Sequence, residues 1–126
     1  MANIETILGI DPSLSSSGWA VLDYNKDKLD DLALQFLEKD TNNNEGNTYK
    51  PTLKDQGLIT TSSDNKLRQR VFKINPEMER IMKFYDPDII SCEDQYSHLN
   101  PDTLKKLSHV RGQYMYLSSV YEIPFW

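Results

Sequence analysis

Two short apolar runs that each end in an acidic residue constrain the fold more than any other feature of this sequence. The first, "ILGI" at residues 7–10, stops at Asp11, and the second, "DIISC" at 88–92, stops at Glu93. Runs of this length, bounded by turn residues, are typical of buried strands. The carboxylate at the end of such a strand either caps a turn or is held on a rigid support for a charged ligand.

The rest of the sequence predicts alternating strands and helices. We expect strands at 6–11, 18–24, 57–63 and 88–93, a helix (or less readily a strand) at 28–39, a loop at 40–56, and the start of a strand in the final "IPFW". Apolar residues every three or four positions predict helices at 64–85 and 101–121. Asn75-Pro76 interrupts the first, so we expect a kink there, or two helices with Asn75 as N-cap. This order predicts one α/β domain, residues 1–126, with a mixed sheet and crossover helices.

Composition excludes several classes of protein. The net charge is -5, which argues against a general polyanion binder, although "KLRQRVFK" at 66–73 and "KKLSHVR" at 105–111 are locally basic. The single cysteine, Cys92, rules out a disulfide framework and favours the cytoplasm. No apolar run approaches the roughly 18 residues of a membrane helix, so we expect no membrane association.

Asp11 and Glu93 predict a cation site if their two strands are neighbours. Both carboxylates would then project from the same end of the sheet, where they repel each other unless a positive group lies between them. Mg²⁺ suits such a pair, because it takes oxygen ligands and keeps several waters. The alternative is that Asp11 only caps a turn and Glu93 is a solvated loop residue.

Four segments together resemble the RuvC Holliday-junction resolvases, in their shorter phage-type version. These segments are "ILGIDPSLSSSGWAVLD", "PDIISCEDQY", "TLKKLSHVRGQYMYL" and "IPFW". The resemblance covers most of residues 4–24 and 57–126, and residues 25–56 look like an insertion. It implies an RNase H-like fold, a homodimer, and nicking of Holliday junctions or other branched DNA in phage recombination. It also implies Mg²⁺ as the cofactor, with Mn²⁺ as a substitute, and the host cytoplasm as the location.

The resemblance also implies roles for individual residues. Asp11 and Glu93 fall on the first two catalytic, metal-binding acids of the family. Tyr96 falls where the family has an aromatic residue beside the exchange point of the junction; the alternative is a loop aromatic packed on the neighbouring helix. The further candidates for DNA contact are His98, Lys105, Lys106 and Arg111, with a solvated surface position as the alternative. The basic residues of the run at 66–73 are a further possibility for phosphate contact, but we favour the alternative that they form the solvated face of a helix. These residues are Lys66, Arg68, Arg70 and Lys73.

The sequence departs from the family pattern at two places. Ser13 stands where the family turn usually has glycine. The family also has two further acids on a C-terminal helix, whereas Glu122 is the only acid after Asp102. We therefore expect the C-terminal strand and catalytic helix to be missing. This leaves two alternatives to a nuclease: a junction-binding module that does not cleave, and, more weakly, an ATP-binding fragment of the actin and sugar-kinase class.

Overall fold

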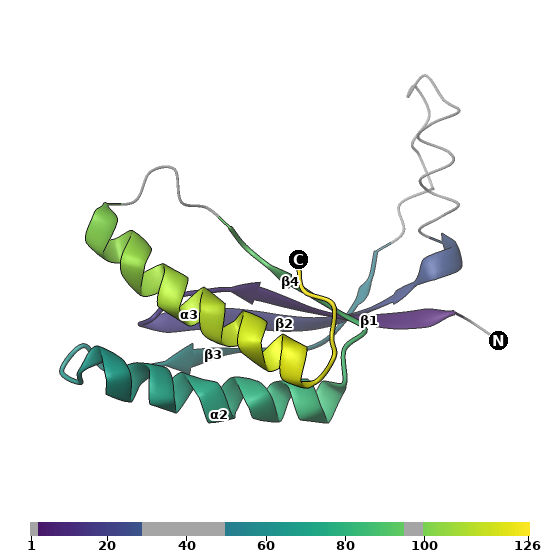
Figure 1. The fold of residues 1–126 in the computed structure, drawn as a ribbon. Helices are drawn as coiled ribbons and strands as arrows, with labels where there is room; N and C mark the ends of the chain where they lie inside the picture. The colour runs from purple at the N-terminus through teal and green to yellow at the C-terminus, as the bar shows by residue number, and fades with distance from the viewer. Residues whose placement is uncertain (1–2, 29–49, 95–99) are drawn as a thin grey trace, which may run out of the picture.

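A computed structural model describes residues 3–28, 50–94 and 100–126 (Figure 1). In chain order the elements are β1 (Ile4–Asp11), β2 (Ser16–Asn25), β3 (Thr52–Thr60), α2 (Leu67–Tyr85), β4 (Ile89–Cys92) and α3 (Pro101–Val120). The strands form one sheet in the order β3-β2-β1-β4, in which β1 is antiparallel to β2 and parallel to β4. The predicted mixed α/β architecture is confirmed.

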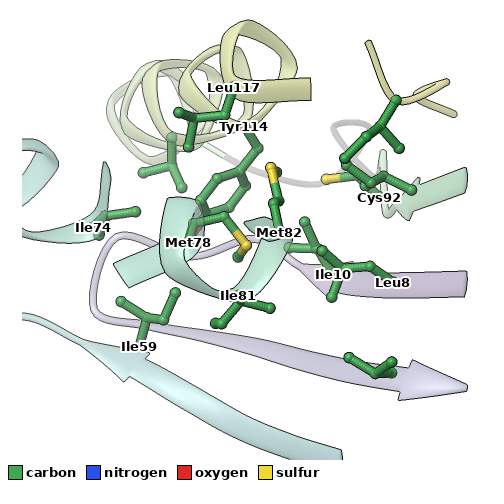
Figure 2. Packing of buried hydrophobic residues seen from close by; sticks show 14 of the residues in the cluster. Leu8, Ile10, Ile59, Ile74, Met78, Ile81, Met82, Cys92, Tyr114 and Leu117 are labelled. Atoms are coloured by element: carbon green, nitrogen blue, oxygen red, sulfur yellow. The ribbon is translucent and has the colours of Figure 1, made fainter. Parts of the chain in front are cut away.

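Both helices pack on the same face of the sheet, and the hydrophobic core lies between them and the strands (Figures 1 and 2). Because side chains alternate along a strand, Leu8 and Ile10 of β1 both point into this core. The core also contains the thiol of Cys92 at the end of β4. The central side chains that Figure 2 labels are Leu8, Ile10, Ile59, Ile74, Met78, Ile81, Met82, Cys92, Tyr114 and Leu117.

The opposite face of the sheet is not covered by a helix in the part of the chain that the structure describes. Along β3, Ile59 faces the helices and is 1% exposed, whereas its neighbour Leu58 faces away and is 66% exposed. We call these two surfaces the covered face and the open face. Gly9 and Asp11 alternate with the core residues of β1 and therefore belong to the open face.

Strand β3 is longer at its start than the sequence suggested. It begins at Thr52, so the prediction of a loop through residue 56 is wrong for its last five residues, and it ends at Thr60 rather than at residue 63. The polar start of β3 is held by backbone pairing with β2, for example Val21 with Asp55. Since its side chains from Thr52 to Gln56 are exposed, no apolar pattern marked it. Apart from Lys28, the helix predicted at 28–39 lies outside the described residues, as does the loop from 40 to 49.

Helix α2 runs without a break through Pro76, so the alternative of two helices with Asn75 as N-cap is wrong. Proline removes one backbone donor, which forfeits a single hydrogen bond. Ile74 and Met78 on either side of Pro76 are both fully buried in the same core, so both halves of the helix are anchored to it.

Helix α3 and the end of the chain follow the sequence expectation. Asn100 caps α3, since its Oδ1 accepts a hydrogen bond from the Thr103 N–H at 2.8 Å, and Pro101 occupies the first helical position. After α3 the chain turns back along β4, where Phe125 pairs with Ile90 in a parallel bridge. The final "IPFW" thus begins a strand beside β4, as predicted. No described helix is long and apolar enough to cross a membrane.

Candidate active site

Asp11 and Glu93 come together at one end of the sheet. The parallel register pairs Ile10 of β1 with Cys92 of β4, so the residues that follow them lie side by side. The Glu93 N–H donates to the Ile10 carbonyl at 3.0 Å, which fixes this pairing. Because Ile10 and Cys92 point into the core, Asp11 and Glu93 point away from it. The adjacency of the two strands, which was the condition for the predicted cation site, is therefore present.

The two carboxyl groups affect each other electrostatically. The pKa of Glu93 is raised above its ordinary value, first by a side-chain hydrogen bond with Asp11, then by the charge of Asp11 and by desolvation. Two carboxylates at such close range repel each other, so the pair holds a proton more tightly than a lone carboxylate would. A divalent cation would relieve the same repulsion, and the all-oxygen donor set fits a hard ion such as Mg²⁺.

A surface hollow of about 540 Å³ surrounds the acid pair, and we call it the acidic hollow. Small residues line much of it; with Asp11 and Glu93, its walls include Gly9, Gly18, Ala20 and Ser91. Side chains this small leave the carboxylates open to a ligand from the open face.

The turn between β1 and β2 is fixed by hydroxyl groups. The Ser13 N–H donates to Ser17 Oγ at 2.9 Å, and the Ser17 hydroxyl donates to the Ser13 carbonyl at 2.6 Å. The buried Tyr114 of α3 donates its hydroxyl to the same Ser17 Oγ at 2.7 Å. Ser13 is not among the described non-glycine residues with a positive φ, so the turn that follows Asp11 has no need of the family's glycine.

The predicted DNA-contact residues lie in different environments. Lys105 and Lys106 project from α3; Lys105 is exposed, and Lys106 forms an ion pair with Asp102 at 3.2 Å. Arg111 instead places its guanidinium 5.2 Å from the centre of the Phe125 ring, against the C-terminal segment. Tyr96 and His98 lie outside the described residues, so their roles stay predictions.

Asp11 and Glu93 form a pair without a third ligand in the described part of the chain. No group of three or more His, Cys, Asp or Glu side chains there could hold a metal ion together. Two carboxylates can take part in a magnesium site, because this ion retains several waters, but a two-ion site needs further acids.

The sequence of this chain is similar to sequences of a known protein family. Residues 44–123 match the family model described as "Crossover junction endodeoxyribonuclease RuvC". The chain belongs to the RuvC family. Proteins of that name from Rickettsia bellii (strain OSU 85-389) and Ehrlichia ruminantium (strain Welgevonden) are 31% and 32% identical over 117 and 120 residues, which is 93% and 95% of this chain. These matches cover 60% and 63% of the relatives, so the chain spans about three fifths of their length.

The fold agrees with solved RuvC structures. "T. thermophilus RuvC in complex with Holliday junction substrate" superposes with a TM-score of 0.74 at 15% identity, covering 96% of this chain and 63% of that one. A Thermus thermophilus RuvC structure gives a TM-score of 0.72 at 16% identity, covering 96% and 61% of the two chains. The expected RNase H-like fold is thereby confirmed. Family membership sets aside the alternative of an actin-like or sugar-kinase fragment.

Sequence reasoning misjudged one residue next to the site, Arg70. We interpreted the run at 66–73 as a solvated helix face, but Arg70 is 8% exposed. The signal was in the spacing: Arg70 lies four residues before Ile74 and eight before Met78, on the buried stripe of α2. A charged side chain on the apolar stripe of a helix is unusual, and this position could have identified Arg70 from the sequence.

Proposed function

We propose that the protein is a structure-selective endonuclease that nicks four-way or otherwise branched DNA. The single observation that carries this proposal is the pairing of Asp11 and Glu93 on the open face of a RuvC-family sheet. It is supported by the crossover junction endodeoxyribonucleases to which the chain is similar, and by the solved relative whose complex contains a Holliday junction. Action in phage recombination, in the host cytoplasm, stays a prediction from the resemblance.

Asp11 and Glu93 would hold Mg²⁺, or Mn²⁺ in its place. When bound, such an ion lowers the pKa of a water nucleophile and stabilises the leaving oxygen. The contribution of the chain is to hold the two carboxylates rigidly at adjacent strand ends, with small side chains around them that let a DNA strand approach. Because the described residues offer no third ligand, the proposal requires further acids from outside them.

Lys105 and Lys106 would contact DNA phosphates beside this site. Both project from α3, and Lys106 is half exposed despite its ion pair with Asp102. An exposed pair of this kind is worth little, so phosphate can compete for the lysine. Arg111 packs against Phe125, so its guanidinium would have to move away from that ring to reach DNA.

The protein would act as a homodimer, as the resemblance implies. Exposed apolar side chains on α3 support this, since Met115, Tyr116 and Val120 are all exposed in the single chain. Sedimentation velocity measures the assembly directly, and a monomer at micromolar concentration would contradict it.

The decisive experiment is nicking of a synthetic four-way junction by the full natural protein in Mg²⁺. We expect Asp11→Asn to reduce the rate on the order of 10³-fold, because transition-state stabilisation by a metal is worth several kcal/mol. Asp94→Asn is the matched control: it makes the same change one residue beyond Glu93, on an exposed side chain, and should cleave normally. Mn²⁺ should support cleavage in place of Mg²⁺.

Two outcomes would contradict the nuclease proposal. Tight junction binding without cleavage by the wild-type protein would leave the alternative of a junction-binding module. Cleavage that survives Asp11→Asn would place the chemistry elsewhere in the chain.

A further inference from the structure

Arg70 is a buried cation that has no acidic partner in the part of the chain that the structure describes. Its Nε donates to Thr61 Oγ1 at 2.8 Å and one terminal nitrogen, Nη2, donates to Ser15 Oγ at 3.0 Å. No described carboxylate forms an ion pair with it. A guanidinium has five N–H donors, so two hydroxyl partners leave most of them unused. Burying a charge without a counter-charge is unfavourable, and the protein therefore keeps Arg70 here at the expense of stability.

The free side of Arg70 opens into a second hollow, of about 380 Å³, which we call the basic hollow. Lys106 lines it from α3, and Ser13, Ser15 and Thr103 contribute hydroxyl-bearing side chains. Among the described residues, none that lines it is acidic. Two cations and three hydroxyl groups around a space of this size suit a tetrahedral oxyanion, because an arginine fork binds phosphate oxygens in pairs and a lysine adds a point charge.

The walls of the basic hollow are held in place before any ligand arrives. Thr61, which accepts from Arg70, donates its own hydroxyl to the Leu14 carbonyl of the β1–β2 turn. The same turn is fixed from α3 through Tyr114 and Ser17. A site whose donors are already ordered loses little conformational freedom on binding.

The basic hollow adjoins the acidic one. Asp11 lines the acidic hollow, and the next residue, Pro12, lines the basic hollow. No described peptide bond is cis, so the two Cα atoms are about 3.8 Å apart. Because α2 and α3 lie on the covered face (Figure 1), a strand with one phosphodiester at the acid pair would reach Arg70 with a neighbouring phosphate by passing around the end of β1.

We propose that the basic hollow binds one backbone phosphate of the DNA strand whose cleavage occurs at Asp11 and Glu93. Arg70 is the main contact and Lys106 the second. This inference rests on the proposed function, which supplies the position of the cut strand. It adds a phosphate-binding subsite to that function.

The test is the salt dependence of junction binding, measured by fluorescence anisotropy with the full natural protein in EDTA. Each neutralised phosphate contributes about 0.9 to the slope of log K against log[salt]. We expect the Arg70→Gln/Lys106→Gln variant to lose about 0.9 from the wild-type slope. The control variant Arg68→Gln/Arg80→Gln removes the same two charges from exposed positions of α2 and should keep the wild-type slope.

The outcomes separate this inference from the proposed function. If the wild-type protein binds the junction and the Arg70→Gln/Lys106→Gln variant keeps its slope, or the control loses as much, the subsite is wrong and the nuclease proposal stands. If the wild-type protein does not bind the junction, both fail. Should Arg70→Gln lower the melting temperature too far, Lys106→Gln alone changes only a half-exposed side chain; unchanged affinity in that variant would also overturn the subsite.

Discussion

The two faces of the sheet differ in what their residues do. On the covered face, side chains such as Ile59 and Ile90 are buried beneath α2 and α3. The open face of the same sheet carries Gly9, Gly18 and the acid pair, which solvent reaches. Because side chains alternate along each strand, the residues that stabilise the fold lie on one face and the residues proposed for catalysis lie on the other.

This separation has a physical reason. A carboxylate beneath a helix would lose its hydration and would have to be paired or protonated. On the open face Asp11 and Glu93 keep access to water and to a cation. The cost is mutual repulsion, which shows as the raised pKa of Glu93. Four experiments test how far the two faces are independent.

The largest contrast is expected between two neighbours on β3. Ile59→Ala should lower the free energy of unfolding by about 2–5 kcal/mol, because it leaves a cavity beneath the helices. Leu58→Ala, on the open face, should change it by less than about 0.5 kcal/mol. Urea denaturation measures both. Equal losses would mean that another part of the protein covers Leu58.

Glycines provide a second contrast between the faces. A Cβ on Gly57 would lie 2.8 Å from the Trp19 ring, so Gly57→Ala should destabilise the protein by about 1–3 kcal/mol. A Cβ on Gly9 would meet its nearest atom at 3.9 Å, so Gly9→Ala should be within about 0.5 kcal/mol of wild type. Thermal unfolding of both variants measures this. A large loss for Gly9→Ala would show that the open face is tightly packed.

The hydroxyl of Tyr114 connects the core to the turn that follows Asp11. Tyr114→Phe removes the bond to Ser17 Oγ, which keeps its hydrogen bonds with Ser13. We therefore expect a loss of about 1 kcal/mol, whereas Tyr116→Phe, at an exposed position of the same helix, should have no effect. Chemical denaturation distinguishes them. If the variants behave alike, this hydroxyl does not stabilise the turn.

The smallest effect concerns pH and the acid pair. The folded-state pKa of Glu93 is raised by its hydrogen bond with Asp11 and by the charge of Asp11, so the acid pair holds a proton more tightly in the folded protein than in the unfolded chain. Stability contributed by the protonated pair is therefore present at lower pH and is lost as the pH rises through the raised value. Asp11→Asn removes the repulsion. The melting temperature of this variant minus that of the wild-type protein, both measured in EDTA, should therefore increase from pH 4 to pH 7. A constant difference would mean that the two carboxylates do not interact.

The parts of the fold and of the site that could be predicted from the sequence were those that depend on burial of apolar side chains. The strands of Asp11 and Glu93 are apolar because they lie over the core, so the strands and their ends were predicted. Their adjacency was only a condition of the predicted cation site, because the pairing of distant segments is set by the fold. The start of β3 was not predicted, because backbone pairing at an edge needs no apolar side chain. The site was predicted only as a pair of acids. The basic hollow was missed, because three separate segments form it and only the fold brings Ser15, Arg70 and Lys106 together.

The buried thiol of Cys92 has a practical consequence. Burial raises its pKa to about 11, so at pH 8 only about one thiol in a thousand is ionised, and the thiolate is the reactive form. Alkylating reagents should therefore modify the native protein slowly and the unfolded chain rapidly. Since this is the only cysteine in the sequence and it directly precedes Glu93, its labelling rate reports how often the sheet opens beneath the acid pair. Labelling of Cys92 thus measures local opening of the sheet at the acid pair.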